Sequence, residues 1–205
     1  MIKKIFYFIK KRLINKKYVN DTFTNEIIKG PNIFIGNYTY GMPQILIYDS
    51  NSSLIIGKFC SFGGDIKIYL GGNHRTDWIS TYPFNSFKFA FPEFHNRIKG
   101  HPQSKGDVII GNDVWVGNNS IILSGVSVGD GAVIGANSVV TKTIGAYEIW
   151  AGNPARFIRK RFDDEKINFL TKIAWWNWEI KKIKENVLLL NNDNVEEFFK
   201  LNYIK

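Results

Sequence analysis

The sequence predicts a mainly β protein: a parallel β-helix interrupted by one long excursion and followed by an α-helical tail. Three observations support this prediction. Aliphatic residues recur every six positions through residues 110–144, nearly forty residues before them lack this period, and an apolar period typical of helices begins after Asp163. The 205 residues suffice for one domain with an appendage, so we divide the chain into residues 1–30, 31–160 and 161–205.

Composition narrows the functional class. Hydrophobic residues make up 44% and charged residues 22%, a balance that excludes a disordered chain. The sequence has no run of roughly eighteen apolar residues and no apolar stretch followed by a small-residue cleavage site, so we expect a cytoplasmic protein. The single cysteine, Cys60, fits a reducing compartment and excludes a cysteine-based metal site.

The net charge of +9 suits an anionic partner, and much of it lies in residues 1–17. There Ile5, Phe8 and Leu13 stand among lysines, which predicts a basic amphipathic helix within residues 1–30. Such a helix could contact the inner face of an anionic membrane, and an ordinary solvated helix is the alternative. No nucleic-acid-reading motif accompanies the charge, so we expect no nucleic-acid partner.

The six-residue period defines the predicted body, residues 31–160. A period of six fits neither a helix nor a simple alternating strand, but it fits short strands joined by turns, three to a coil, with the aliphatic side chains stacked inward. Compact or β-branched residues stand four positions after each aliphatic residue. The two series are Ile110, Val116, Ile122, Val128, Ile134, Val140 and Val114, Ser120, Val126, Ala132, Ser138, Ile144.

Two earlier coils precede this series, marked by Ile35-Gly36 and Ile56-Gly57. Cys60 stands four positions after Ile56, so we interpret it as a compact interior residue and not as a nucleophile. Between the earlier and later coils, about residues 69–106, the period is replaced by aromatic residues, polar residues and prolines. A loop this long is uncommon as a simple connection in a compact domain, so its length predicts a functional loop.

The tail, residues 161–205, has helical periodicity. Asp163 or Asp164 can cap the first helix, and Asp193 with Glu196 predicts a capping box for the last. We expect the tryptophans of this tail to anchor it to the coils and not to bind a cofactor; they are Trp175, Trp176 and Trp178.

His74 is the candidate general base. Histidine titrates near pH 6.5, about where a proton acceptor must work. His74 stands where the coil ends and the excursion begins, so the rigid body can position it beside an open cleft. A lone loop histidine is otherwise more often structural, so its context has to decide.

Six separated motifs resemble the xenobiotic acetyltransferase branch of the hexapeptide-repeat acyltransferases, over about residues 33–185. They are Ile56-Gly57-Lys58-Phe59-Cys60-Ser61, Gly72-Asn73-His74-Arg75, Ser80-Thr81-Tyr82-Pro83-Phe84, Ile110-Gly111-Asn112-Asp113-Val114-Trp115-Val116-Gly117, Ala136-Asn137-Ser138-Val139-Val140-Thr141-Lys142 and Gly152-Asn153-Pro154-Ala155-Arg156. The resemblance implies a left-handed parallel β-helix of hexapeptide repeats. It also implies a homotrimer with acetyl-CoA between neighbouring subunits and no metal. His74 is then the base of a direct transfer without an acyl-enzyme.

The resemblance also implies a set of cofactor-binding residues. Trp115 would form one wall of the pocket for the acetyl group. The alternative role of its ring is ordinary packing outside a coil. Backbone groups at repeat corners would bind the pantetheine arm and cations would meet the phosphates, with Lys160 and Arg161 sharing that role. A solvated basic face is the alternative for the cations. The remaining residues are Asn118, Ala136, Thr141, Lys142, Arg156 and Arg159.

The acceptor is the open question. The run from Tyr38 to Leu54 is short and the residues after His74 are similar to those of polysaccharide-associated relatives, which favours O-acetylation of a sugar or cell-surface polysaccharide precursor. The alternative acceptor is an antibiotic of the chloramphenicol or streptogramin class, and an amino group is not excluded as the nucleophile. A non-catalytic glycan-binding scaffold is the rival class, disfavoured by the presence of His74 and Thr141-Lys142.

Overall fold

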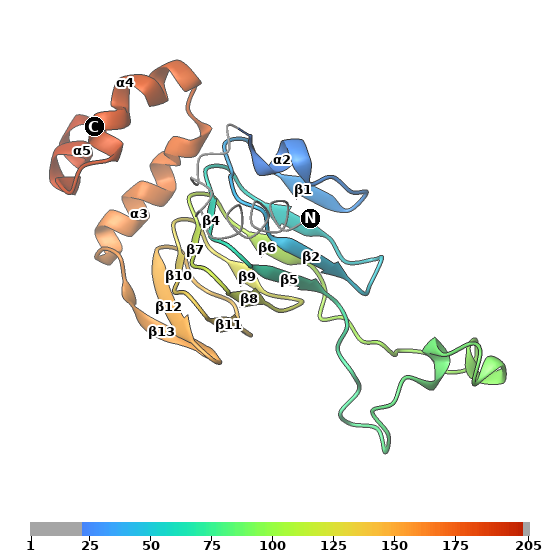
Figure 1. Cartoon of the computed structure of the whole chain (residues 1–205). Helices are drawn as coiled ribbons and strands as arrows, with labels where there is room; N and C mark the ends of the chain where they lie inside the picture. Colours follow the sequence, from blue (N-terminus) through green and yellow to red (C-terminus); the bar gives the residue numbers. More distant parts are fainter. Residues whose placement is uncertain (1–21, 203–205) are drawn as a thin grey trace, which may run out of the picture.

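The computed structural model describes residues 22–202, and its body is a stack of short strands wound around one axis (Figure 1). The basic segment of residues 1–17 lies outside the described residues. Of the predicted N-terminal helical region, only residues 22–30 are described, and they contain one short helix, α2 (Thr24–Ile27). No helix among the described residues has the length and apolar character needed to cross a membrane.

The body consists of three sheets, which successive strands from β3 to β11 visit in rotation. All pairings between neighbouring coils are parallel, and the stack ends in one antiparallel hairpin, β12–β13. The first sheet contains β1 (Ile33–Ile35), β3 (Leu54–Ile56), β6 (Val108–Ile110) and β9 (Ser127–Val128). The second contains β4 (Ser61–Phe62), β7 (Trp115–Val116), β10 (Val133–Ile134), β12 (Glu148–Gly152) and β13 (Ala155–Lys160). The third contains β2 (Gln44–Ile47), β5 (Lys67–Leu70), β8 (Ile121–Ile122) and β11 (Val139–Val140).

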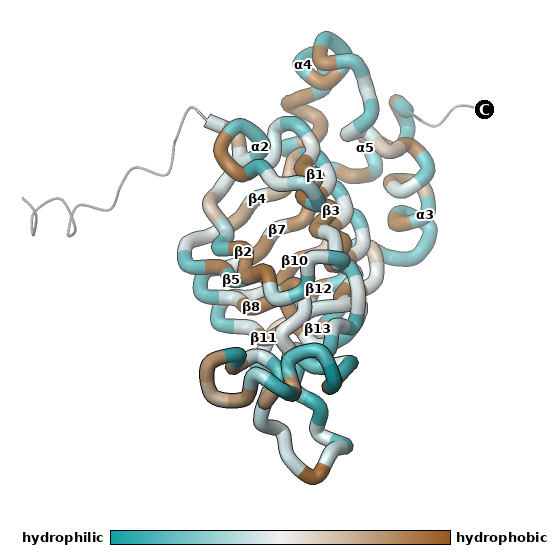
Figure 2. The backbone as a smooth tube through the Cα atoms, turned by 90° about the vertical axis from the view of Figure 1, so that its right-hand side faces the viewer, coloured by the Kyte–Doolittle hydropathy of each residue, from teal (hydrophilic) through white to brown (hydrophobic). Residues whose placement is uncertain are grey.

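The six-residue period is confirmed as the core of the molecule. All the aliphatic residues of the series, and all the residues four positions later, are 2% exposed or less. Figure 2 shows the consequence as apolar strands alternating with polar corners. Two buried serines of the series, Ser120 and Ser138, donate hydrogen bonds to the carbonyl oxygen of Gly135, which offsets the cost of burying their hydroxyls.

The close stacking of successive coils explains why position 117 is a glycine. A Cβ atom on Gly117 would lie 2.5 Å from the backbone nitrogen of Ala136 in the next coil. Any side chain there would push two coils apart, because real Cβ contacts do not come so close. Cys60 is fully buried in the same core, as its place in the period predicts.

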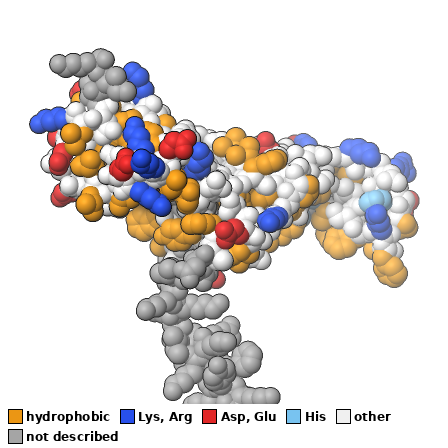
Figure 3. Space-filling model, turned by 90° about the horizontal axis from the view of Figure 1, so that it is seen from above, with side chains coloured by type: hydrophobic (Ala, Val, Ile, Leu, Met, Phe, Trp, Pro, Cys, Tyr) orange, Lys and Arg blue, Asp and Glu red, His pale blue; other side chains and the backbone are white. Residues whose placement is uncertain are grey.

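The excursion leaves the body after Leu70 and returns at Val108, close to the predicted limits. It projects from the side of β2, β5 and β8 and contains two short 3-10 turns, η1 (Phe84–Ser86) and η2 (Pro92–Phe94) (Figure 1). Figure 3 shows it from above, at right, bearing exposed hydrophobic and basic side chains. The excursion therefore extends well beyond the β-helix that supports it.

The tail is helical, with α3 (Asp164–Ile173), η3 (Trp175–Asn177), α4 (Ile180–Leu190) and α5 (Val195–Asn202). Asp163 caps α3 by accepting a hydrogen bond from the backbone nitrogen of Lys166 at 2.9 Å. The predicted capping box of α5 is wrong by one residue: the side chain of Asn194, not Asp193, accepts from the backbone nitrogen of Glu197. Glu196, the other member of the predicted box, instead pairs with Lys166 across to α3.

The tryptophans of the tail pack as anchors. Trp176 is 4% exposed. The ring centroid of Trp175 lies 4.9 Å from that of Phe59, which is in the turn between β3 and β4 of the body. Trp178 stacks on Phe198 of α5. The contact of Trp175 with Phe59 fastens the tail to one corner of the β-helix, while that of Trp178 with Phe198 holds the tail together.

Candidate active site

His74 lies near the point where the excursion leaves the body. It directly follows Asn73, whose backbone pairing with Gln103 we call the clamp. Asn73 and Gln103 exchange two backbone hydrogen bonds of 2.9 and 2.7 Å, which join the outgoing and returning strands of the excursion. The side chain of Asn73 also donates to the hydroxyl of Ser124 on the body, at 3.1 Å. The position that precedes His74 is therefore fixed to the rigid coils.

One hydrogen bond assigns the tautomer of His74. Its Nδ1 lies 2.7 Å from the carbonyl oxygen of Thr81. A carbonyl oxygen can only accept, so Nδ1 carries the proton and Nε2 of the neutral ring has a free lone pair. Because the side chain is exposed, that lone pair is available to a ligand. The arrangement is that of a general base oriented by a second group.

A second histidine contacts the first. The ring of His101 meets that of His74 edge-on, with centroids 4.8 Å apart, and His101 is only 5% exposed. Neither ring nitrogen of His101 has a hydrogen-bond partner among the described residues. The sequence analysis missed this residue, although its position just before the chain rejoins the body mirrors that of His74 and could have indicated it.

Asp77, three positions after His74, is engaged by a neighbouring arginine. Arg75 lies over the ring of Trp78 at 5.0 Å and forms a bidentate pair with Asp77. The hydrogen bonds from Arg75 lower the pKa of Asp77 to about 2, so this carboxylate stays ionised and engaged. It is a weak base and does not compete with the imidazole. The remaining histidine, His95, donates from Nδ1 to the carbonyl oxygen of Asn85 within the excursion.

Trp115 and His74 lie on different faces of one chain. Trp115 is on the outer face of β7 in the second sheet and is 56% exposed, in register with Ser61 and Val133. His74 follows β5 of the third sheet. A single chain therefore does not bring the two residues together, although each is accessible.

The other predicted cofactor residues occupy two corners. Asn118 and Ala136 are exposed at successive turns that follow β7 and β10, and the carbonyl of Asn118 accepts a hydrogen bond from Asn137. The side-chain oxygen of Asn118 is occupied by the backbone nitrogen of Gly64, at 2.9 Å. Thr141 and Lys142 follow β11 at the next corner, where Lys142 is exposed.

The cations predicted to bind phosphate fall into two groups, three at the surface of β13 and Arg161 beside the tail. Arg156 and Arg159 are exposed on β13, and within residues 22–202 each donates only to a backbone carbonyl in its neighbourhood, which leaves further donors for an anion. Lys160 pairs with Asp164, and this hydrogen bond raises the pKa of its ammonium group. All three lie at the surface.

Arg161 does not belong to this surface. Its Nη1 donates to the carbonyl oxygen of Gly131 at 2.7 Å and lies 3.4 Å from a carboxylate oxygen of Asp113. These contacts turn the Arg161 guanidinium toward Gly131 and Asp113, and its share in phosphate binding stays a prediction. The described residues also contain no group of three or more His, Cys, Asp or Glu side chains placed to hold a metal ion.

Comparison with known proteins places these features in a family. The family model "Bacterial transferase hexapeptide (six repeats)" matches residues 107–142. A chloramphenicol acetyltransferase of Agrobacterium fabrum is 41% identical over 187 residues, which cover 84% of this chain and 88% of that protein. A virginiamycin A acetyltransferase of Staphylococcus aureus is 42% identical over 89% of this chain and 85% of that protein. A probable macrolide acetyltransferase of Lysinibacillus sphaericus is 50% identical over 68% of this chain and 78% of that protein.

The chain belongs to the xenobiotic acetyltransferase branch of the hexapeptide-repeat acyltransferases. Its fold is therefore the left-handed β-helix of that family, and the rotation of strands through three sheets agrees with it. This acetyltransferase uses acetyl-CoA as donor. What the family does not fix is the acceptor and the role of each residue in this chain.

Proposed function

We propose that this acetyltransferase transfers the acetyl group of acetyl-CoA to a hydroxyl group of an antibiotic of the chloramphenicol or streptogramin class. The observation that carries the proposal is the set of relatives named for chloramphenicol and virginiamycin A, which align over more than four-fifths of the chain. They support the antibiotic alternative better than the sugar acceptor that the sequence analysis preferred. The short run from Tyr38 to Leu54 is therefore a weak guide to the acceptor.

The surface of the excursion agrees with an apolar acceptor. Tyr82 stacks on Phe87 at 5.4 Å, and both rings are nearly half exposed. Ile79 and Phe89 are fully exposed. Such side chains are costly in water unless something covers them, and an amphipathic aromatic drug is a suitable partner.

In the proposed mechanism, Nε2 of His74 accepts the proton of the acceptor hydroxyl as its oxygen attacks the thioester carbonyl. A carbon–oxygen bond forms and the carbon–sulfur bond breaks. The imidazolium then returns the proton to the departing thiolate, so no acyl-enzyme is required. The carbonyl of Thr81 holds the ring in the required tautomer and stabilises its cationic form through the hydrogen bond from Nδ1.

The exposed cations fit the phosphates of the donor. Arg156 and Arg159 lie on one surface strand with N–H groups that have no partner in the described part of the chain, and guanidinium groups match phosphate geometry well. The turns at Asn118 and Ala136 would bind the pantetheine amides through their backbone. Thr141 and Lys142 would complete this site.

We also propose that the active site forms between copies of the chain in a homotrimer. The outer face of the first sheet supports this, since Phe34, Ile55 and Ile109 lie side by side in register and are each 39% exposed or more. An apolar ladder of this kind is typical of an interface. In such an assembly His74 of one copy would act beside Trp115 of another.

An acceptor panel tests the proposed function. Release of free CoA from acetyl-CoA is measured with chloramphenicol, a streptogramin A antibiotic, a macrolide, maltose and a galactoside. We expect turnover with at least one of the antibiotics and none with the sugars. Chloramphenicol with all its hydroxyls already acetylated is the matched control and should not react. Turnover with a sugar alone would overturn the antibiotic proposal, and no turnover with any acceptor would favour a scaffold.

A further inference from the structure

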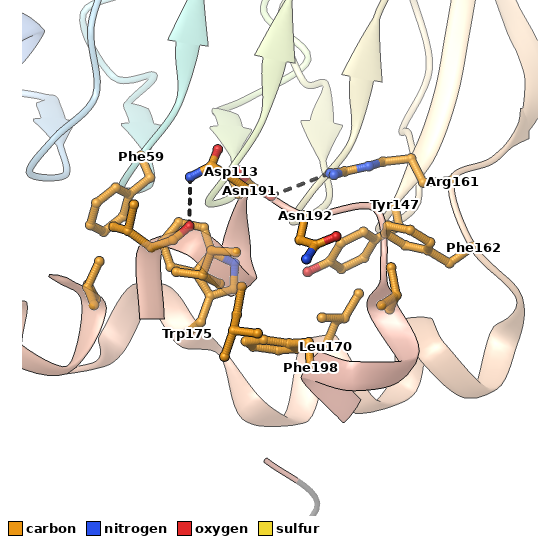
Figure 4. Close-up of a pocket in the computed structure, with 15 residues that line it drawn as sticks. Phe59, Asp113, Tyr147, Arg161, Phe162, Leu170, Trp175, Asn191, Asn192 and Phe198 are labelled. Atoms are coloured by element: carbon orange, nitrogen blue, oxygen red, sulfur yellow. Dashed lines mark hydrogen bonds and ion pairs between the residues drawn. The ribbon is translucent and has the colours of Figure 1, made fainter. Parts of the chain in front are cut away.

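A cavity of about 430 Å³ lies between the β-helix and the C-terminal helices (Figure 4). We call it the tail cavity. The tail and the excursion lie on opposite sides of the body in Figures 1 and 2, so the tail cavity is remote from His74. The proposed acetyl-transfer mechanism uses none of its lining residues. The residues that define it here are Phe59, Asp113, Tyr147, Arg161, Trp175 and Phe198.

Tyr147 contributes an unpartnered polar group. The residue is 1% exposed, and its hydroxyl has no hydrogen-bond partner among the described residues. Figure 4 shows its hydroxyl end directed into the tail cavity. Burial raises the pKa of this hydroxyl, so it remains protonated and can donate. A buried hydroxyl without a partner is unfavourable, which makes a ligand atom at this point stabilising.

The polar wall beside Tyr147 carries no net charge. Arg161 and Asp113 lie 3.4 Å apart, and the guanidinium also lies over the ring of Tyr147 at 5.2 Å. Opposite charges that offset each other do not favour an ionic ligand. The carboxylate can nevertheless accept a hydrogen bond, while Tyr147 donates one. A ligand hydroxyl group can satisfy both, because a hydroxyl donates and accepts at once.

Apart from Asn191 and Asn192, the rest of the lining is aromatic and aliphatic. Phe59 lies in the turn between β3 and β4, and Phe162 follows the end of β13. Trp175 and Phe198 belong to the tail. Several flat rings around one space favour a flat apolar molecule, since aromatic pairs gain from stacked and edge-on contacts beyond their buried area. The volume is in the range of small-molecule sites.

We propose that the tail cavity binds an uncharged aromatic molecule with one hydroxyl group, of the phenol or naphthol class, at a site separate from the acetyl-transfer site. The hydroxyl of the ligand accepts from Tyr147 and donates to Asp113. Its ring lies against Trp175 and Phe198.

The test compares three probes on the full chain by ligand-observed NMR and calorimetry: 2-naphthol, naphthalene without the hydroxyl, and the anion 2-naphthoate. We expect 2-naphthol to bind about fivefold more tightly than naphthalene, the effect of one hydrogen bond, and more tightly than 2-naphthoate. Tyr147→Phe, which removes only the hydroxyl, should weaken this preference, because only the hydrogen bond to Asp113 remains, while naphthalene binding is unchanged. Tyr48→Phe, at an exposed tyrosine beyond β2, is the matched control and should leave all three affinities unchanged.

Two further variants test whether the probes bind in the tail cavity. Val187 lines the mouth of the tail cavity and is 40% exposed, so Val187→Trp should block all probes without disturbing the core. His74→Ala should leave 2-naphthol binding unchanged, which separates this site from an acceptor site. No binding to the wild-type chain, tighter binding of 2-naphthoate, an undiminished naphthol preference in Tyr147→Phe, or loss of binding in His74→Ala would each overturn the proposal.

Discussion

At the scale of single residues, environment separates side chains that look alike in the sequence. His74 and His95 both donate from Nδ1 to a backbone carbonyl, so both have a free Nε2 in the neutral form. Only His74 is exposed and joined to the body through the clamp at Asn73. Arg159 and Arg161 differ in the same way, since one is at the surface and the other is folded against Asp113.

Cys60 should be unreactive in the folded protein. It is fully buried, and desolvation raises the pKa of its thiol to about 12, so almost no thiolate is present at neutral pH. We expect a thiol reagent such as DTNB to modify a negligible fraction of the folded protein within minutes. In concentrated urea the same reagent should titrate one thiol per chain. Rapid labelling of the folded protein would contradict the inward orientation of this position.

At the scale of elements, the sequence predicts what its periods encode. The six-residue period fixes which residues point inward, because each unit contains one strand and one turn. All the inward positions of the series in residues 110–144 are buried, and Ile35 of the earlier coil is partly buried. The helical tail was predictable from its apolar spacing for the same reason. The cap of α5 was not, since Asp193 and Asn194 are both good caps and the choice depends on how α5 packs.

The cap of α3 should make stability depend on pH. Hydrogen bonds from the side chain and the backbone of Lys166 lower the pKa of Asp163 below its ordinary value of 3.8. A lowered folded-state pKa contributes stability that is present above the unfolded-state pKa and is lost as the pH falls through the folded-state value. Asp163→Asn keeps the cap but cannot titrate.

We therefore expect the wild type to be more stable than Asp163→Asn at pH 7, with the difference shrinking toward zero as the pH falls below about 4. The measurement is the urea midpoint by circular dichroism over a pH series. Asp193→Asn removes the same charge where no helix is capped, and it is the matched control. A difference between wild type and Asp163→Asn that does not change with pH would contradict this account of the cap.

At the scale of the whole molecule, the sequence was least informative. It predicted an excursion and a tail, but it contains no periodic signal for the direction in which the excursion projects or for the corner that the tail covers. The tail cavity and the contacts of Arg161 with Gly131 and Asp113 both result from that packing. The pairing of His74 with His101 depends likewise on how the two ends of the excursion meet.

The assembly prediction belongs to this scale. If the ladder of Phe34, Ile55 and Ile109 is an interface, the chain of 23.6 kDa should sediment as a trimer of about 71 kDa. Ile55→Glu should yield monomers and reduce acetyl transfer at least tenfold, because a charge at the centre of an apolar interface is unfavourable. Lys67→Glu, on the outer face of the third sheet, changes charge away from the ladder and should remain trimeric. A monomeric wild type, or a trimeric Ile55→Glu variant, would exclude this interface.

The most direct test of the account is the kinetics of His74→Ala with an acceptor that the wild type turns over. We predict that kcat/KM falls at least about 100-fold, the usual effect of removing a general base, while the affinity for acetyl-CoA measured by calorimetry stays unchanged. His95→Ala, which removes an imidazole held by the same kind of hydrogen bond, should remain close to wild type. A His74→Ala variant whose kcat/KM stays within about threefold of wild type would contradict the assignment of His74 as the base.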